Sequence, residues 1–263
     1  MVMEHGDADL GVILGEHRHE GNLSINKIRF FWEEILKCVG AVHQKNIIHL
    51  DLKPENFLMV SGVLKVIDFG LAHRKASSAC KISFKPAPSK RNFLKAFLKS
   101  RICIYGNRIT SSSDKLVSQH SMPGSFQYSP PENFRYIYDD GTFVKNPNDF
   151  DYDTDDEEDY KERKKHIELT SNADIWSCGV ILYMMVYDGV QPFSCVGGGR
   201  SSKIVALKSW TEVEFPPHKF PESVASGLIQ TLKTSLRKDP KERADVKELQ
   251  KSSFLRGPFL EKF

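Results

Sequence analysis

Four side chains in one short part of the chain have the types and the spacing that chemistry on phosphate requires. The stretch IIHLDLKPENFLMV, residues 47–60, is followed closely by a DFG tripeptide that begins at Asp68. Phosphoryl transfer to a hydroxyl needs an oriented nucleophile, a bound metal and neutralisation of the charge that develops on the phosphate. Asp51 can accept the hydroxyl proton, and Lys53 brings positive charge to the same phosphate. Asn56 and Asp68 offer the oxygen ligands that Mg²⁺ prefers.

Each of these signals is weak when it stands alone. An Asp, a Lys and an Asn on one loop also occur as an ordinary turn with a surface ion pair, and a bare DFG occurs by chance. Their order, with Asp68 seventeen positions after Asp51, favours the chemical interpretation. We therefore predict Asp51 and Lys53 as catalytic residues, Lys53, Asn56 and Asp68 as contacts to a nucleotide, and Asn56 and Asp68 as metal ligands.

The segments around this loop predict the elements that position it. Apolar pairs and runs at 47–48, 57–60 and 64–67 predict short strands, the last two joined by a Ser61-Gly62 turn. Apolar residues recur at intervals of three and four from Asn26 to His43, which predicts an amphipathic helix.

Further helices are predicted on both sides of this region. Ser24 is a suitable N-cap for the helix over 26–43. Residues 173–187 are apolar on nearly all sides, which predicts a helix in the interior of a domain. Two amphipathic helices are predicted over 225–236 and 244–249.

Composition excludes several classes of protein. Hydrophobic residues make up 40% of the 263 residues, which is enough for a sizeable core. The longest apolar run, CGVILYMMVY, is too short to span a bilayer, so no membrane association is expected. Five cysteines without a CxxC pair argue against a disulfide framework or a zinc site. We expect an intracellular protein, and no secretory signal is visible at the N-terminus.

Two strongly charged stretches interrupt the predicted elements. Residues 72–124 hold eleven Lys or Arg and one Asp, a net charge of +10, and eight of the residues from 149 to 159 are acidic. We interpret them as solvated insertions, at 72–124 and 138–170, in a domain that ends near residue 255 before a tail at 256–263. Within the basic insertion, NFLKAFLKSRI (92–102) has helical spacing of its apolar residues, and docking on a membrane or a partner is the alternative there.

Several motifs together resemble those of eukaryotic protein kinases. DLKPEN resembles the serine/threonine form of the catalytic loop, and SFQYSPPE, which ends at Glu132, resembles the substrate-binding loop with Pro130 in place of an Ala. DIWSCG resembles the buried helix whose Asp, here Asp174, supports the catalytic loop, and Arg243 resembles the arginine that pairs with Glu132. The resemblance implies an α+β fold over 1–255: the mainly helical C-terminal lobe of a kinase, with short β-hairpins at the active site.

Four segments narrow the resemblance to one group of kinases, the monopolar-spindle (TTK-type) kinases. These segments are MVMEHGDADL, NFLMVSGVLKVIDFGLA, PPE and EFPP. The resemblance implies that MVME is the hinge and that ATP and Mg²⁺ are the cofactors. The residues implied to hold ATP are Met3 as gatekeeper, the backbone of Glu4 and His5 at the adenine, Asp9 at the ribose, and Leu58 and Ile67 below the adenine. Ordinary core packing would by itself explain the apolar residues Met3, Leu58 and Ile67.

The same resemblance implies a function. It is phosphorylation of protein Ser and Thr, with Tyr as a further acceptor, in the spindle checkpoint. The implied partners are protein substrates and kinetochore proteins, and the implied location is the nucleus and cytoplasm, with the kinetochore as a site of action. Nucleic-acid binding is not expected, because a basic stretch alone is weak evidence for it and no known binding fold accompanies the stretch.

The sequence departs from the family in two informative ways. It begins at the hinge, so the N-terminal lobe with its glycine-rich loop and phosphate-pairing lysine is absent from this chain. We expect a longer native protein, and the alternative is a truncated isoform that acts as a noncatalytic binding module. Leu50 stands where many kinases have an Arg that pairs with a phosphate on the activation loop, so we expect activation by another route.

Overall fold

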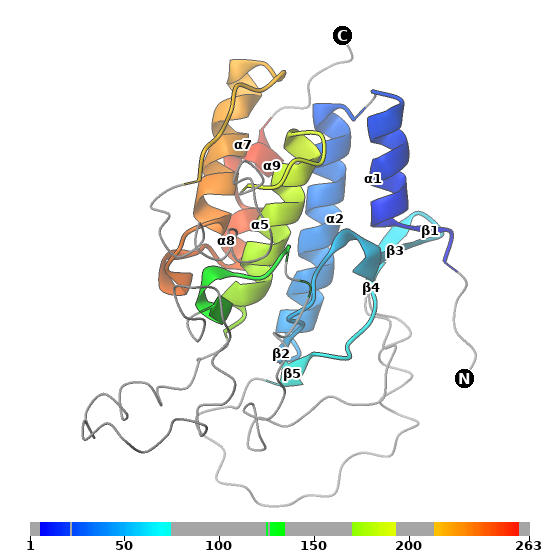
Figure 1. Ribbon diagram of the computed structural model, residues 1–263, viewed down its shortest axis with the longest axis vertical. Coiled ribbons are helices and arrows are strands. Elements are labelled where there is room, and N and C mark those ends of the chain that lie inside the picture. Colours follow the sequence, from blue (N-terminus) through cyan, green and yellow to red (C-terminus); the bar gives the residue numbers. More distant parts are fainter. Residues whose placement is uncertain are drawn as a thin grey trace, which may run out of the picture.

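The structure, a computed structural model, places the predicted loop at the edge of a helical layer (Figure 1). It describes residues 6–21, 23–74, 125, 127–134, 170–192 and 213–257. Within this part of the chain, no helix is long and apolar enough to cross a membrane. Several predictions lie outside it: the hinge residues Met3, Glu4 and His5, nearly all of the insertions at 72–124 and 138–170, and the tail from 258.

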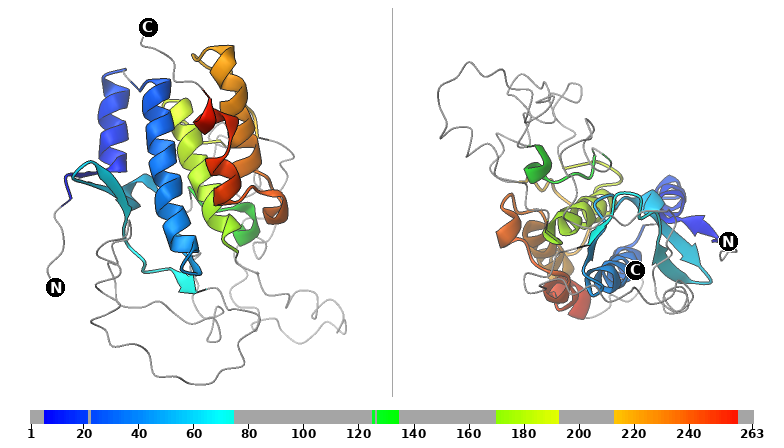
Figure 2. Two further views of the ribbon diagram at one scale, coloured as in Figure 1. Left: turned by 180° about the vertical axis from the view of Figure 1, so that it is seen from behind. Right: turned by 90° about the horizontal axis from the view of Figure 1, so that it is seen from below.

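Two long helices form the centre of the described part. The helix α2 (Ile25–His43) lies beside α5 (Asn172–Val186) in the views of Figures 1 and 2. Ile28, Ile35 and Val39 of α2 are buried, as their spacing predicts. The hydroxyl of Ser24 accepts a hydrogen bond from the N–H of Lys27 at 3.3 Å and so caps the helix, which confirms the predicted N-cap.

The helix α5 is buried almost completely, which confirms the prediction made from its apolar sequence. Only Asn172 and Met184 of its residues are not fully buried. Gly179 lets the next helix approach, since a Cβ added there would lie 2.9 Å from side-chain atoms of both Ser235 and Leu236. A glycine in this helix is therefore a packing requirement, although glycine lowers helix propensity.

Shorter helices cover α2 and α5. The helix α7 (Glu222–Ser235) packs on α5, and α8 (Val246–Gln250) packs on α2; both were predicted with shifted ends. The helix α9 (Ser253–Arg256) packs on α7 and is not among the predicted elements. Nor is α1 (Leu10–His19), which buries Leu10 and Leu14 although its glycines weaken helix propensity.

Short strands hold the predicted loop between them, as expected. A three-stranded antiparallel sheet has the order β1 (Ala8–Asp9), β3 (Phe57–Val60), β4 (Val63–Val66), with Asp9 opposite Leu58 and Phe57 opposite Val66. A second pair joins β2 (Ile47–Ile48) to β5 (His73–Arg74). The loop between β2 and β3 includes the 3-10 helix η1 (Pro54–Asn56).

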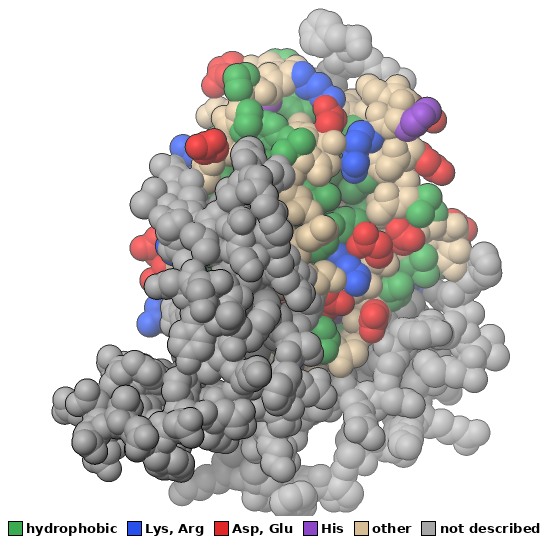
Figure 3. All heavy atoms as spheres, viewed as in Figure 1, with side chains coloured by type: hydrophobic (Ala, Val, Ile, Leu, Met, Phe, Trp, Pro, Cys, Tyr) green, Lys and Arg blue, Asp and Glu red, His purple; other side chains and the backbone are tan. Residues whose placement is uncertain are grey.

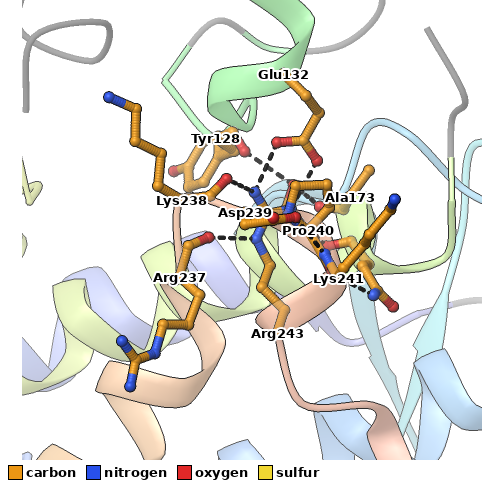
Figure 4. A network of polar contacts seen from close by, with 11 residues as sticks. Tyr128, Glu132, Ala173, Arg237, Lys238, Asp239, Pro240, Lys241 and Arg243 are labelled. Atoms are coloured by element: carbon orange, nitrogen blue, oxygen red, sulfur yellow. Dashed lines mark hydrogen bonds and ion pairs between the residues drawn. The ribbon is translucent and has the colours of Figure 1, made fainter. Parts of the chain in front are cut away.

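A buried ion pair joins the substrate-loop motif to the C-terminal helices (Figure 4). Arg243 follows the 3-10 helix η3 (Pro240–Glu242) and donates two hydrogen bonds of 2.6 Å to the carboxylate of Glu132 in η2 (Pro131–Phe134). It also donates to the backbone oxygens of Arg237 and Asn172. The pairing predicted from the sequence is confirmed, and the bidentate geometry makes it a strong contact.

We expect Glu132→Ala to lower the free energy of unfolding by about 3–5 kcal/mol, because it leaves the fully buried guanidinium of Arg243 without its counter-charge. Urea denaturation measures the change. Lys219→Ala, which breaks the exposed pair with Asp188, is the control and should cost less than about 1 kcal/mol. Similar losses in the two variants would contradict the role given to the buried pair.

Candidate active site

The backbone of the predicted catalytic loop is held by one carboxylate from α5. The N–H of His49 donates to Asp174 Oδ2 at 2.9 Å, and the N–H of Leu50 donates to Oδ1 at 2.8 Å. His43 Nε2, at the end of α2, lies 2.8 Å from Oδ2. Asp174 is 0% exposed, so the burial of its charge depends on these three donors. The support that the resemblance implied for Asp174 is confirmed.

The ionisation of Asp174 follows from the same contacts. Burial by itself would raise the pKa of Asp174, because a low-dielectric interior disfavours the charged form. The hydrogen bond and charge of His43, the charge of His49 and the His49 N–H act in the opposite direction, and the pKa ends below its ordinary value. The loop is therefore built around an ionised carboxylate.

Leu50 adopts a backbone conformation that an apolar residue rarely takes. Its φ of +64° lies in the left-handed region, which costs a residue with a Cβ roughly 1–2 kcal/mol. Its side chain is 7% exposed and packs in a small buried cluster with Ile48 and Ala173. Burying a Leu side chain stabilises by about 1.5–3 kcal/mol, so this contact and the bond to Asp174 can together offset the strain.

The loop is also tied to the segment that carries Asp68. His49 Nε2 lies 3.0 Å from the backbone oxygen of Ile67, and the His49 ring lies 4.8 Å from that of Phe69. The N–H of Ile67 donates to the backbone oxygen of Asn56 at 2.9 Å. Residues on both sides of Asp68 therefore contact the loop that carries the other predicted residues.

Asp51 lies at the centre of a polar cluster. Its Oδ1 accepts a hydrogen bond of 2.6 Å from the N–H of Ser125, and its Oδ2 lies 3.5 Å from Lys53 Nζ. Lys53 Nζ in turn donates to the hydroxyl of Ser125 at 3.0 Å. The amide nitrogen of Asn56 donates to the backbone oxygen of Asp51 at 2.7 Å. The structure thus brings Asp51, Lys53 and Asn56 together, as their spacing predicts.

Asn56 and Asp68 carry the types of oxygen donor that Mg²⁺ prefers. Because the Asn56 amide nitrogen is used by the Asp51 backbone, its side-chain oxygen is left as the acceptor. The carboxylate of Asp68 is exposed, and one of its oxygens accepts from the N–H of Gly70 at 3.2 Å. No cluster of three or more His, Cys, Asp or Glu that could hold a metal occurs in the described residues. Mg²⁺ commonly takes one or two protein ligands together with phosphate oxygens and water, which this pair allows.

The residues predicted to hold the nucleoside differ in their surroundings. Asp9 Oδ1 accepts from the N–H of Val12 at 3.0 Å and caps α1, so its carboxylate has a structural role whether or not it meets a ribose. Leu58 and Ile67 are partly exposed, and Leu58 lies directly against Gly6, where a Cβ would collide with it. Neither residue is sealed inside the core, and their place below the adenine stays a prediction.

Charge is distributed unevenly around this site. Asp7, Glu55 and Asp68 are exposed carboxylates in the part of the chain formed by β1, η1 and β4. Acidic side chains gather to the right of the centre on the face drawn in Figure 3. A triphosphate would be repelled by such a surface, so the positive charges of Lys53 and of a divalent cation would be needed beside it.

Two residues of the site were not among the predicted site residues. Ser125 contacts both Asp51 and Lys53, and its only sequence signal is its place at the start of the SFQYSPPE motif. His43 contacts Asp174 from 131 positions away, and it reads in the sequence as the last residue of an amphipathic helix. Neither contact follows from local spacing.

Comparison with known proteins agrees with the geometry. Residues 1–89 match the model of the protein kinase domain. The chain is 28% identical over 261 residues to the serine/threonine-protein kinase MPS1 of Saccharomyces cerevisiae, covering 99% of the chain and 27% of that protein. It is 29% identical to the dual specificity protein kinase TTK of Mus musculus, covering 95% of the chain and 22% of that protein.

The chain resembles the MPS1 and TTK protein kinases. The likeness extends to the kinase mph1 of Schizosaccharomyces pombe, at 29% identity over 97% of the chain and 31% of that protein. The protein kinase fold is therefore supported over residues 1–89, which include the DFG segment. The chain spans between about a fifth and a third of the length of these relatives.

The lowered pKa of Asp174 predicts a dependence of stability on acid. The contribution of the ionised carboxylate is complete above the unfolded pKa of about 3.9 and is lost as pH falls through the lower native pKa. We expect Asp174→Asn to be less stable than the wild type at pH 7 but to lose less stability between about pH 5 and pH 3. Urea denaturation at several pH values checks this.

Asp188→Asn, at an exposed position, serves as the control and should keep the acid dependence of the wild type. If Asp174→Asn and the wild type lost stability equally on acidification, the carboxylate would not be the ionised centre of the loop.

Proposed function

We propose that the protein transfers the γ-phosphoryl group of ATP to Ser and Thr hydroxyls of other proteins, with Tyr as a further acceptor. The observation that carries this proposal is the cluster in which Asp51 and Lys53 both contact Ser125 of the substrate-loop motif and Asn56 contacts Asp51. A carboxylate, an ammonium and an amide that converge on one loop are the groups that phosphoryl transfer requires.

Each residue has a distinct role in the proposed reaction. Asp51 accepts the proton of the attacking hydroxyl and orients its oxygen. The hydroxyl oxygen forms a bond to the γ-phosphorus while the bond to the bridging oxygen breaks, which releases ADP. Lys53 stabilises the charge on the transferred group from the side of Ser125. Asn56 and Asp68 would hold Mg²⁺, which neutralises the phosphates.

The finer features of the proposal follow from the family resemblance. The described residues would correspond to the C-terminal lobe of a kinase, with the nucleotide between this lobe and an N-terminal one. Met3, Glu4 and His5 would contact the adenine from the hinge. Action in the spindle checkpoint on kinetochore proteins, in the nucleus and cytoplasm, belongs to the same proposal.

In a preparation of the protein that has kinase activity, Asp51→Asn should lower kcat by about two or more orders of magnitude, while the affinity for ATP changes little. The change removes the proton acceptor but keeps the size of the side chain and its contacts with Ser125. Steady-state kinetics with a protein substrate measure kcat and KM. Asp188→Asn makes the same substitution on the surface and should leave both unchanged; turnover that survives in Asp51→Asn would exclude Asp51 as the base.

Asp68→Asn should weaken Mg²⁺-dependent nucleotide binding about tenfold, because it removes the charged ligand of the metal. Titration of the chain with ATP, in the presence and absence of Mg²⁺, measures the difference. Binding of ATP without Mg²⁺ should be the same in the variant and the wild type. An equal effect of Mg²⁺ on nucleotide binding in Asp68→Asn and in the wild type would exclude Asp68 as the charged ligand of the metal.

A further inference from the structure

Leu50 stands apart among the described residues with a positive φ. The other non-glycine residues of this kind are Asn46, Ser61, Asp68 and Asp188, whose short polar side chains can form local hydrogen bonds in this conformation. The Leu side chain offers no such bond. Its presence at a strained position therefore indicates a contact made elsewhere in the fold.

That contact is with the same end of α5 that holds the Leu50 backbone. The side chains of Leu50, Ile48 and Ala173 form a buried cluster that is separate from the main core. Ala173 directly precedes Asp174, which accepts the N–H of Leu50 at 2.8 Å. Adjacent residues of α5 thus hold Leu50 at two points, one apolar and one charged.

We propose that Leu50 is a positioning residue whose apolar side chain fixes the direction in which Asp51 points. The inference rests on the proposed function, because it takes Asp51 as the base. Rotation of the Leu50 backbone would move Asp51 away from Ser125, and the packing of Leu50 on Ile48 and Ala173 opposes that rotation. An apolar contact needs no counter-charge, so this part of the anchoring does not depend on a phosphate group or on ionic strength.

Leu50→Asn tests the anchor, because Asn has the same branched shape as Leu and accepts a positive φ but cannot make the apolar contact. We expect amide exchange at residues 49–52 of the full 263-residue chain to rise about tenfold. Hydrogen–deuterium exchange with mass spectrometry measures it. Leu50→Met, which keeps an apolar side chain of similar volume, should restore the wild-type rate.

Ser61→Asn is the matched control, since it places the same residue at a φ of +50° in the exposed turn between β3 and β4. Exchange at 49–52 should then stay within about twofold of the wild type. Wild-type exchange in Leu50→Asn, an equal rise in Ser61→Asn, or no recovery in Leu50→Met would overturn the proposal.

A kinetic measurement separates positioning from general stability. In a preparation of the protein that has kinase activity, Leu50→Asn should lower kcat about tenfold and leave KM for ATP within about twofold. Both effects should be the same at low and at high salt. An unchanged kcat would overturn the role of Leu50. If Asp51→Asn left turnover intact, the proposed function would fail, and the exchange experiment would still decide whether Leu50 anchors the loop.

Discussion

The buried carboxylate of Asp174 is the constraint on which the rest of the site depends. A charge removed from water destabilises a protein unless donors replace the water, and here the donors come from α2 and from the loop after β2. The helix α5 therefore cannot be buried in its native form while the loop is disordered. The catalytic loop and the helical core are coupled through this one residue.

The site divides into chemistry that is local in sequence and support that is not. Asp51, Lys53, Asn56 and Asp68 lie within one short part of the chain, next to strands that begin and end around them. Their supports come from far away: Ser125 bonds to Asp51 across 74 positions, and Asp174 to Leu50 across 124. The loop supplies the reactive groups, and distant elements determine their orientation.

This division explains which features could be predicted from the sequence. The spacing of apolar residues predicted α2 and α5, because amphipathic and fully apolar patterns report on burial directly. The same spacing did not predict α1. Two glycines oppose helix formation there, and packing on the rest of the fold stabilises the helix instead. The contacts of Ser125 and His43 could not be predicted, because local periodicity carries no information about pairing across more than seventy positions.

The glycine of α5 lets α7 pack more closely on α5 than any residue with a Cβ would allow. Gly179 brings α7 so close that one added methyl group would meet Ser235 and Leu236. It lies five positions after Asp174 along the helix, a distance of about 7.5 Å. One helix therefore has two roles: its middle sets how closely α7 can pack, and its first turn carries the carboxylate that holds the loop.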